Sequence, residues 1–199
     1  MILKGWYSGF MGKNEGIKAL AFGVIVIVVL GITGYLIFST ISTNVKSVTG
    51  GPVHWHADFE IYSCGEKVDL IDPKGWDNKV GTPLLHEHND GRIHVEGPVM
   101  NFADISLGNF FNVVGGLPLE KQGECNGQPA ILQAFVYQTE GNTFSQQKLE
   151  DFTNYVLSNY SKVPPGDCII IEFGPIKDRT DKLCNFYKTA VDKGEFSER

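Results

Sequence analysis

The chain has 199 residues, a mass of 22.0 kDa, a formal net charge of −6 at pH 7 and a pI near 5.3. This length is enough for one domain, or for one domain with an appendage, and excludes a large multidomain assembly. The acidic balance and the lack of a dense lysine or arginine cluster argue against nucleic acid as a partner, because nothing neutralises a run of phosphates. The 23 glycines, 13 phenylalanines and 7 tyrosines favour a sheet-rich body with frequent turns.

A long apolar segment runs from Ile17 to Phe38 and contains one charged residue, Lys18, at its edge. As a helix it would extend about 33 Å, enough to cross the hydrocarbon core of a bilayer. Apolar residues surround its whole circumference, so we interpret it as a transmembrane helix rather than a buried core helix. A signal peptide has a shorter apolar core that ends at a small-residue cleavage site, so we expect an uncleaved anchor.

The lysines near this segment predict its orientation. Three of them lie before the span or at its start, whereas the first stretch after the span contains only Lys46. Cytoplasmic flanks carry the excess of basic residues. We therefore expect a cytoplasmic amino terminus over residues 1–16, a single-pass helix over 17–38 and an extracytoplasmic location for the rest of the chain.

Four cysteines follow the apolar segment, namely Cys64, Cys125, Cys168 and Cys184. An even number of cysteines in an oxidising compartment permits up to two disulfides, and the sequence allows three pairings. A bond between Cys168 and Cys184 would tie the carboxy-terminal tail to the core. Free buried thiols are the alternative.

The small polar residues from Ser39 to Pro52 predict a flexible linker. A β-rich domain is expected over residues 53–174. At its start, the alternation of residues 56–63 and the turn at Gly65 predict a hairpin with residues 67–71. Turn-forming residues over 72–83 then predict a loop, and residues 92–97 predict a short strand.

Further along, Asp104 or Ser106 is expected to cap a short helix over residues 107–114, which ends at two glycines. Residues 128–138 predict a strand. Residues 167–174 predict another, and their continuous apolar run is typical of a central strand. The segment 151–160 fits either a helix or an irregular amphipathic segment, and residues 175–199 predict a charged tail with a helix packed against the domain.

All five histidines lie within residues 54–94 of the chain. On a strand, His54 and His56 would project from the same face with Cα atoms roughly 6.6–6.8 Å apart. That spacing lets two imidazoles converge on one ion held at about 2.0–2.1 Å from each nitrogen. A single pair of this kind is more often structural.

The other histidines strengthen the prediction of a metal site. His86 and His88 repeat the spacing of the first pair, and His94 shares a face with Glu96 on the next expected strand. The methionines lie elsewhere, which argues against a thioether copper(I) site, whereas imidazole ligation suits zinc or copper(II). Four nearby carboxylates can act as ligand, as acceptor for a ligating histidine, as general base or simply as solvated loop charge, namely Asp58, Glu87, Asp90 and Glu96.

Four stretches of the sequence, HWHADFEIY, LHEHNDGRIHVEGP, ISLGNFFNVVG and DCIIIEFG, together resemble a family of membrane-anchored or secreted archaeal and bacterial proteins without an established activity. Its members share a His-x-His strand, an LHxHD-GxIHVE block and an LGxFFxxWG helix. The resemblance covers about residues 53–174, but Asn89 precedes Asp90 here and Val114 replaces the tryptophan. It implies a small extracytoplasmic α+β domain with a final strand similar to the end of β-grasp domains.

We therefore expect a membrane-anchored α+β protein whose outer domain binds one zinc or copper ion through a histidine cluster. The expected ligands are drawn from His54, His56, His86, His88, His94 and Glu96. Its task would be metal binding, metal delivery or redox support of a membrane partner. One alternative is a zinc-dependent hydrolase or hydratase, in which Glu96 or Asp58 orients a water molecule. The other is a metal-free structural or interaction domain.

Overall fold

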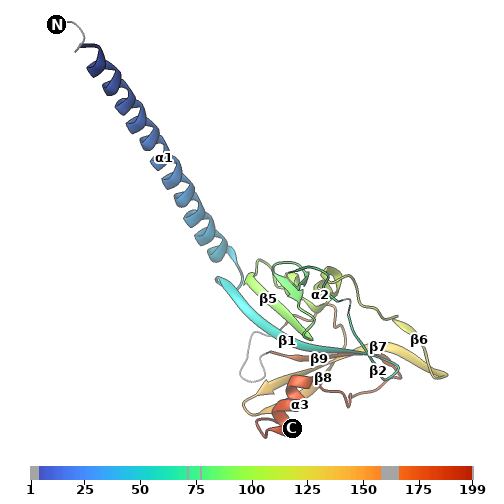
Figure 1. Ribbon diagram of the computed structural model, residues 1–199. Coiled ribbons are helices and arrows are strands. Elements are labelled where there is room, and N and C mark those ends of the chain that lie inside the picture. Colours follow the sequence, from blue (N-terminus) through green and yellow to red (C-terminus); the bar gives the residue numbers. More distant parts are fainter. Residues whose placement is uncertain (1–4, 71, 77, 158–165, 199) are drawn as a thin grey trace. The chain divides into compact units, whose positions relative to one another are not determined.

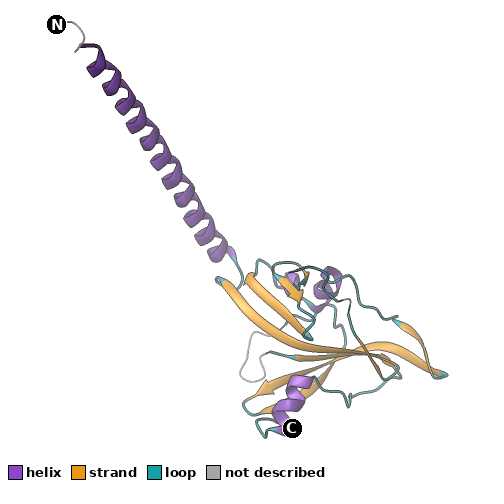
Figure 2. Ribbon diagram, viewed as in Figure 1, coloured by secondary structure: helices purple, strands orange, loops and turns teal. Residues whose placement is uncertain are grey.

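The computed structural model describes residues 5–70, 72–76, 78–157 and 166–198 (Figure 1). The chain divides into two compact units, one up to Lys46 and one from Ser47 onward. The first unit is a single helix and the second combines a mixed sheet with short helices (Figure 2). The protein therefore has the expected α+β composition with an apolar amino-terminal helix.

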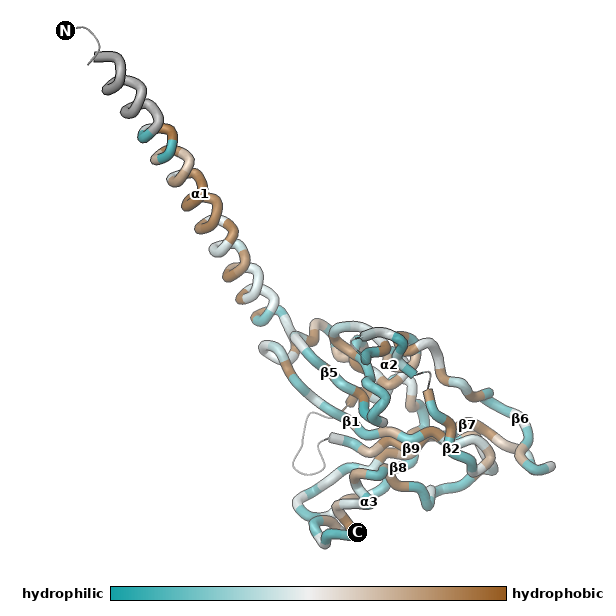
Figure 3. Tube along the Cα trace, viewed as in Figure 1, coloured by the Kyte–Doolittle hydropathy of each residue, from teal (hydrophilic) through white to brown (hydrophobic). Residues whose placement is uncertain are grey.

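Helix α1 (Gly5–Lys46) has 42 residues and a length of about 63 Å. Its most apolar window lies within residues 15–46 and is not buried, and Figure 3 shows mostly brown over the middle of the helix and white to teal at its carboxy-terminal end. Apolar side chains are exposed all around it; Leu20, Ile27 and Phe38 are each about 70% exposed. By length and composition, α1 can cross a bilayer.

The expected linker from Ser39 to Pro52 is largely structured. Its first part, up to Lys46, continues α1, where the hydroxyl of Thr40 donates to the Leu36 carbonyl at 2.9 Å. Serine and threonine are tolerated inside a helix when the hydroxyl bonds to the carbonyl four residues back. The remaining residues form turns, and Pro52 already begins the first strand.

The second unit is built on one sheet with the strand order β10-β8-β7-β9-β1-β5-β4-β3, while β2 pairs with β1 and β6 with β7. The strands are β1 (Pro52–Ser63), β2 (Glu66–Val68), β3 (Val80–Gly81), β4 (Leu85–Glu87), β5 (Arg92–Pro98), β6 (Gln122–Cys125), β7 (Gln128–Glu140), β8 (Thr143–Leu149), β9 (Cys168–Gly174) and β10 (Ser197–Glu198). β1 runs parallel to β9, and β10 runs parallel to β8; the other pairs are antiparallel. The β-grasp likeness of this arrangement stays a prediction.

Most of the predicted elements are confirmed. The β1–β2 hairpin turns at Gly65, but β2 ends at Val68, before the predicted end at residue 71, which lies outside the described residues. β5, β7 and β9 lie where the sequence predicted them. Ser106 caps helix α2 (Leu107–Val113) by accepting from the Asn109 N–H at 3.2 Å. Asp104 belongs instead to the preceding 3₁₀ turn η1 (Phe102–Ile105). The short strands β3, β4, β6, β8 and β10 were not predicted.

The segment expected at 151–160 is irregular in its described part, residues 151–157, and bridges to Ser106 through Val156. Residues 158–160 of that segment lie outside the described residues. The tail after Pro175 contains helix α3 (Asn185–Asp192) and strand β10, which adds to the sheet beside β8. It belongs to the same compact unit as the rest of the sheet.

Two apolar cores cover the two faces of the sheet. η1 and α2 pack on one face, where Ile169 and Ile171 of β9 are fully buried. α3 packs on the other face, against Ile170 of β9. Because both faces of β9 are covered, its sequence is a continuous apolar run, as expected for a central strand.

Two disulfides close the second unit. Cys64 is bonded to Cys125, and Cys168 is bonded to Cys184, so all four cysteines are used. The second bond ties the start of α3 to β9, so of the three pairings that the sequence left open the structure has the one that links the tail to the core.

Candidate metal centre

Strand pairing brings the five histidines together. In the register of β1 and β5, His56 lies opposite His94 and His54 lies opposite Glu96. In the register of β4 and β5, His86 also lies opposite His94. The intervening residues, such as Ala57, face the α2 side core. Because side chains alternate across a sheet, the histidines project from the opposite face.

The rings form a contiguous cluster around His94. Its ring centroid lies 4.7 Å from that of His56, 4.8 Å from that of His88 and 5.5 Å from that of His86. His54 contacts His56, and His86 contacts His88, at 4.7 and 4.8 Å between ring centroids. All five imidazoles are therefore near neighbours.

Two sets of three histidines have ligand nitrogens within 4.8 Å of one another. We name His86, His88 and His94 the inner set, and His54, His56 and His94 the outer set. Tetrahedral zinc with nitrogens at about 2.0–2.1 Å places these nitrogens about 3.3–3.4 Å apart. The nitrogens of each set lie within 4.8 Å of one another, so the rings would have to move closer together around a bound ion.

Each ring of the inner set is held through one nitrogen by an acceptor. Nδ1 of His86 donates to the Thr82 carbonyl at 3.1 Å, and Nδ1 of His88 donates to the Asn78 carbonyl at 2.7 Å. Nε2 of His94 donates to the Asp90 carboxylate at 3.0 Å. A neutral imidazole with one nitrogen donating has a lone pair on the other. Metal-ligating histidines are oriented by acceptors of this kind.

The backbone around β3 and β4 positions these acceptors. Gly81 has a φ of +120°, and a Cβ atom there would lie 2.5 Å from the Leu85 carbonyl oxygen, so the turn that carries Thr82 requires glycine. Asn78 has a φ of +49°, which asparagine tolerates, and its side-chain amide donates to the His88 carbonyl at 2.8 Å. His88 is thus held by both the main chain and the side chain of Asn78.

Burial lowers the imidazole pKa of three of the five histidines. His86 is completely buried, and this burial, together with the positive charge of Lys79, lowers the pKa of its imidazole to about 4. Burial is also the main cause of the lowered pKa values of His56 and His94. These three rings therefore offer lone pairs at pH 7 instead of carrying charge.

One nitrogen of the inner set lacks a hydrogen-bond partner. Nε2 of His86 is buried, and no atom of the described residues forms a hydrogen bond with it. The nearest carboxylate oxygen is Oε2 of Glu96, at 3.7 Å. A buried polar atom without a partner costs about 1–3 kcal/mol, so such an atom calls for an explanation.

The carboxylates near the histidines have different partners. Glu96 lies between the two sets, with Oε1 3.6 Å from Nε2 of His54. Asp58 pairs with Arg92, with 2.9 Å between Oδ1 and Nε, and burial raises the pKa of its carboxyl to about 6. Glu87 accepts from the backbone N–H of Asn89, and burial raises its pKa. Of the four carboxylates, Glu96 and Asp90 therefore contact the histidines directly.

Sequence reasoning did not identify the carbonyls of Thr82 and Asn78. Both lie in the segment predicted as a loop, and a main-chain acceptor leaves no residue-type signal. The asparagine at a position with positive φ was the one available hint, because this residue type favours such turns.

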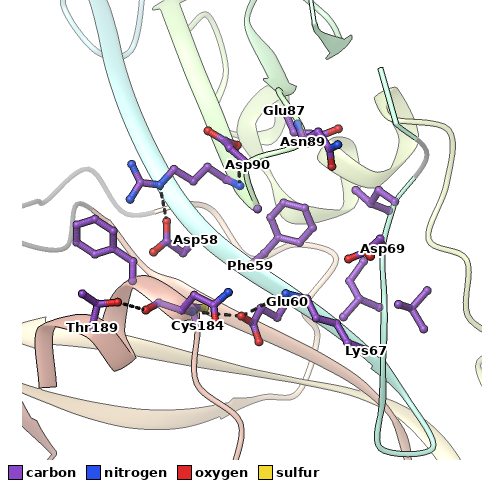
Figure 4. Close-up of a pocket in the computed structure, with 17 residues that line it drawn as sticks. Asp58, Phe59, Glu60, Lys67, Asp69, Glu87, Asn89, Asp90, Cys184 and Thr189 are labelled. Carbon is purple, nitrogen blue, oxygen red and sulfur yellow. Dashed lines mark hydrogen bonds and ion pairs between the residues drawn. The ribbon is translucent and has the colours of Figure 1, made fainter. Parts of the chain in front are cut away.

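A pocket of about 570 Å³ adjoins the cluster (Figure 4). Its lining comes from β1, from β2 and the residues after it, from the segment between β4 and β5, and from the start of α3. Asp58 and its partner Arg92 lie on its wall, as does Asp90, which also holds His94. None of the five histidines, all of them described, lines this pocket.

Comparison of the chain with models of protein families, with curated proteins and with solved structures gives no match. The family resemblance of residues 53–174 therefore stays a prediction. The chemistry of the histidine cluster has to follow from its own geometry.

Proposed function

We propose that the protein is a membrane-anchored metal-binding protein whose second unit holds one zinc or copper ion. The inner set, His86, His88 and His94, supplies three nitrogen ligands. The observation that carries the proposal is the buried Nε2 of His86, which has a lone pair, no hydrogen-bond partner among the described residues and two other imidazoles beside it. A cation at this point would give the lone pair the partner that it lacks.

Glu96 is the fourth candidate ligand. One of its oxygens lies 3.7 Å from Nε2 of His86, so a modest side-chain movement brings a carboxylate into the coordination sphere. Three imidazoles and one carboxylate form a closed tetrahedral site, which holds an ion without leaving a coordination position open for a reaction. The same donor set binds zinc and copper(II) and disfavours calcium and magnesium, which take oxygen ligands.

The hydrolase alternative uses the same three histidines with Glu96 as a base rather than a ligand. It requires an open coordination position, whereas the binding function does not. The protein loaded with cobalt(II) in place of zinc distinguishes the two. Azide should leave its visible spectrum unchanged if Glu96 closes the site, and should shift the spectrum if the position is open.

Two features support anchoring of the domain outside the cytoplasm. α1 is apolar and exposed all around, as a membrane-spanning helix is, and the second unit contains two disulfides, which persist in oxidising compartments. The lysine distribution favours a cytoplasmic amino terminus over residues 1–16 and a span over 17–38. A membrane protein that gives or receives the ion is the partner we expect.

Elemental analysis tests the proposal. The full chain, purified in detergent without a histidine tag, is incubated with zinc or copper(II), dialysed and measured by plasma mass spectrometry. We expect about one equivalent of one of these metals per chain. Less than about 0.1 equivalent of either metal in correctly folded, disulfide-bonded protein would exclude the proposed function.

A further inference from the structure

The outer set differs from the inner set in its access to solvent. The side chain of His54 is 64% exposed, and those of His56 and His88 are half-buried, whereas His86 is completely buried. An ion from solution therefore meets His54 and His56 before it reaches His86. The inner set is the more protected of the two.

The outer pair already has the spacing of a chelate. Nε2 of His54 lies 3.1 Å from Nε2 of His56, close to the separation of about 3.3–3.4 Å that one tetrahedral ion imposes on two of its ligands. In the metal-free structure the two nitrogens form a hydrogen bond in which one imidazole donates to the other. If the donor ring carries its proton on Nδ1 instead, both Nε2 atoms present lone pairs to the same point. The arrangement is suited to binding a cation between them.

His94 and Glu96 connect the two sets. His94 belongs to both, and because its Nε2 donates to Asp90, only one nitrogen carries a lone pair for a metal ion. The two sets therefore cannot both use His94 at the same time. Glu96 has one oxygen 3.6 Å from Nε2 of His54 and the other 3.7 Å from Nε2 of His86.

We infer that His54 and His56 capture the metal ion at the surface and transfer it to the buried inner set through the shared ligand His94, with Glu96 contacting the ion on both sides of the transfer. This inference rests on the proposed function and adds a route of loading to it. The ion keeps at least one protein ligand throughout the transfer, so a cation that has lost its water ligands is never left uncoordinated. No bond other than the coordination bonds changes.

Exchange kinetics of zinc test this route. The full chain in detergent is mixed with Zn²⁺, and uptake and release are followed with a chromogenic chelator. In the H54A/H56A variant we expect one equivalent of zinc and a similar affinity at equilibrium, but uptake and release both about tenfold slower than in the unchanged chain. The control is S145A/Q147A, which removes two exposed polar side chains at the same spacing on β8.

The reciprocal variant, H86A/H88A, should still bind zinc weakly and exchange it rapidly while free zinc is present, because the outer pair and His94 are intact, and should lose that zinc on dialysis. Unchanged exchange rates in H54A/H56A, two equivalents of zinc in the unchanged chain, or complete loss of binding in H86A/H88A would each overturn the transfer route. If the unchanged chain binds no metal, the proposed function itself fails. The failure of the route and the failure of the function are thus separate results.

Discussion

One face of the sheet has two halves that differ in what covers them: helix α3 packs on one half, and the histidine cluster lies on the other. Over β9, β7 and β8, this face is covered by α3, packed through Tyr187 and Phe144 and tied down by the Cys168–Cys184 bond. Over β1, β5 and β4, the same face carries the histidine cluster. Along β1 the side chains at every second position belong to this face, from His54 to Tyr62.

The two halves bury different kinds of side chain, because a helix covers only one of them. The α3 half buries aromatic rings and a disulfide, which stabilise the fold. The histidine half buries imidazoles that have lone pairs, and in Nε2 of His86 a polar atom without a hydrogen-bond partner among the described residues. The first half is covered by α3, whereas Nε2 of His86 in the second half gains a partner only when a cation binds.

The largest expected effect removes the inner set. In H86A/H88A, the metal retained after dialysis should fall from about one equivalent to below about 0.1, because two of three ligands and the buried site are lost. Plasma mass spectrometry measures it, and S145A/Q147A is the control. Full metal content in H86A/H88A would show that the ion is held elsewhere. The histidine half of the face would then no longer differ from the α3 half by holding a metal ion.

The second prediction concerns the α3 half. In C168S/C184S, the free energy of unfolding should fall by about 3 kcal/mol, as expected for a bond that closes a loop with a sequence separation of 16. Urea unfolding followed by circular dichroism measures it. The metal content should stay at about one equivalent, since the histidine cluster lies on other strands. Loss of metal would show that the two halves depend on each other.

The third prediction uses pH on the metal-free protein. The pKa of His86 is about 4 in the folded protein and about 6.5 when unfolded, so between these values only the unfolded chain is protonated there. The free energy of unfolding therefore falls as the pH falls through this window, by about 2 kcal/mol from pH 7 to pH 5. The H86Q variant lacks this contribution.

Urea unfolding of both proteins at the two pH values, with a chelator present, gives the difference. Asp58, with its raised pKa of about 6, contributes a dependence of opposite sign, but it is present in both proteins and cancels. An identical loss of stability in the two proteins would mean that His86 is protonated in the folded state near its ordinary pKa. The assignment of His86 as a buried imidazole that stays neutral in the folded protein would then be wrong.

The smallest expected effect removes the side chain that fixes His88. In N78G, the backbone retains its positive φ while the amide that donates to the His88 carbonyl is lost, so the affinity for zinc should fall about tenfold. Competition with a chelator measures it. The matched control is N126G, which changes an asparagine with φ +52° in the turn between β6 and β7. Equal affinities of the two variants would limit Asn78 to a role in the turn.

The local pattern of the sequence predicted several parts of the fold. β7 and β9, the β1–β2 hairpin and α2 with its Ser106 cap follow from alternation, a continuous apolar run and capping chemistry. The short strands β3, β4 and β10 could not be predicted, because two or three residues carry no periodicity. The α1 boundary was missed because serine and threonine resemble a linker until their hydroxyls bond within the helix.

The sequence by itself determined which residues could form a metal site, since the spacing of His54 with His56 and of His86 with His88 places each pair on one side of the chain. Only the tertiary structure decided that these two histidine pairs lie next to each other around His94. The antiparallel register of β1, β5 and β4 places His94 next to both, and the turn at Gly81 brings the Thr82 carbonyl to His86. Such contacts depend on strand pairing and main-chain direction, which residue spacing along one chain segment does not specify.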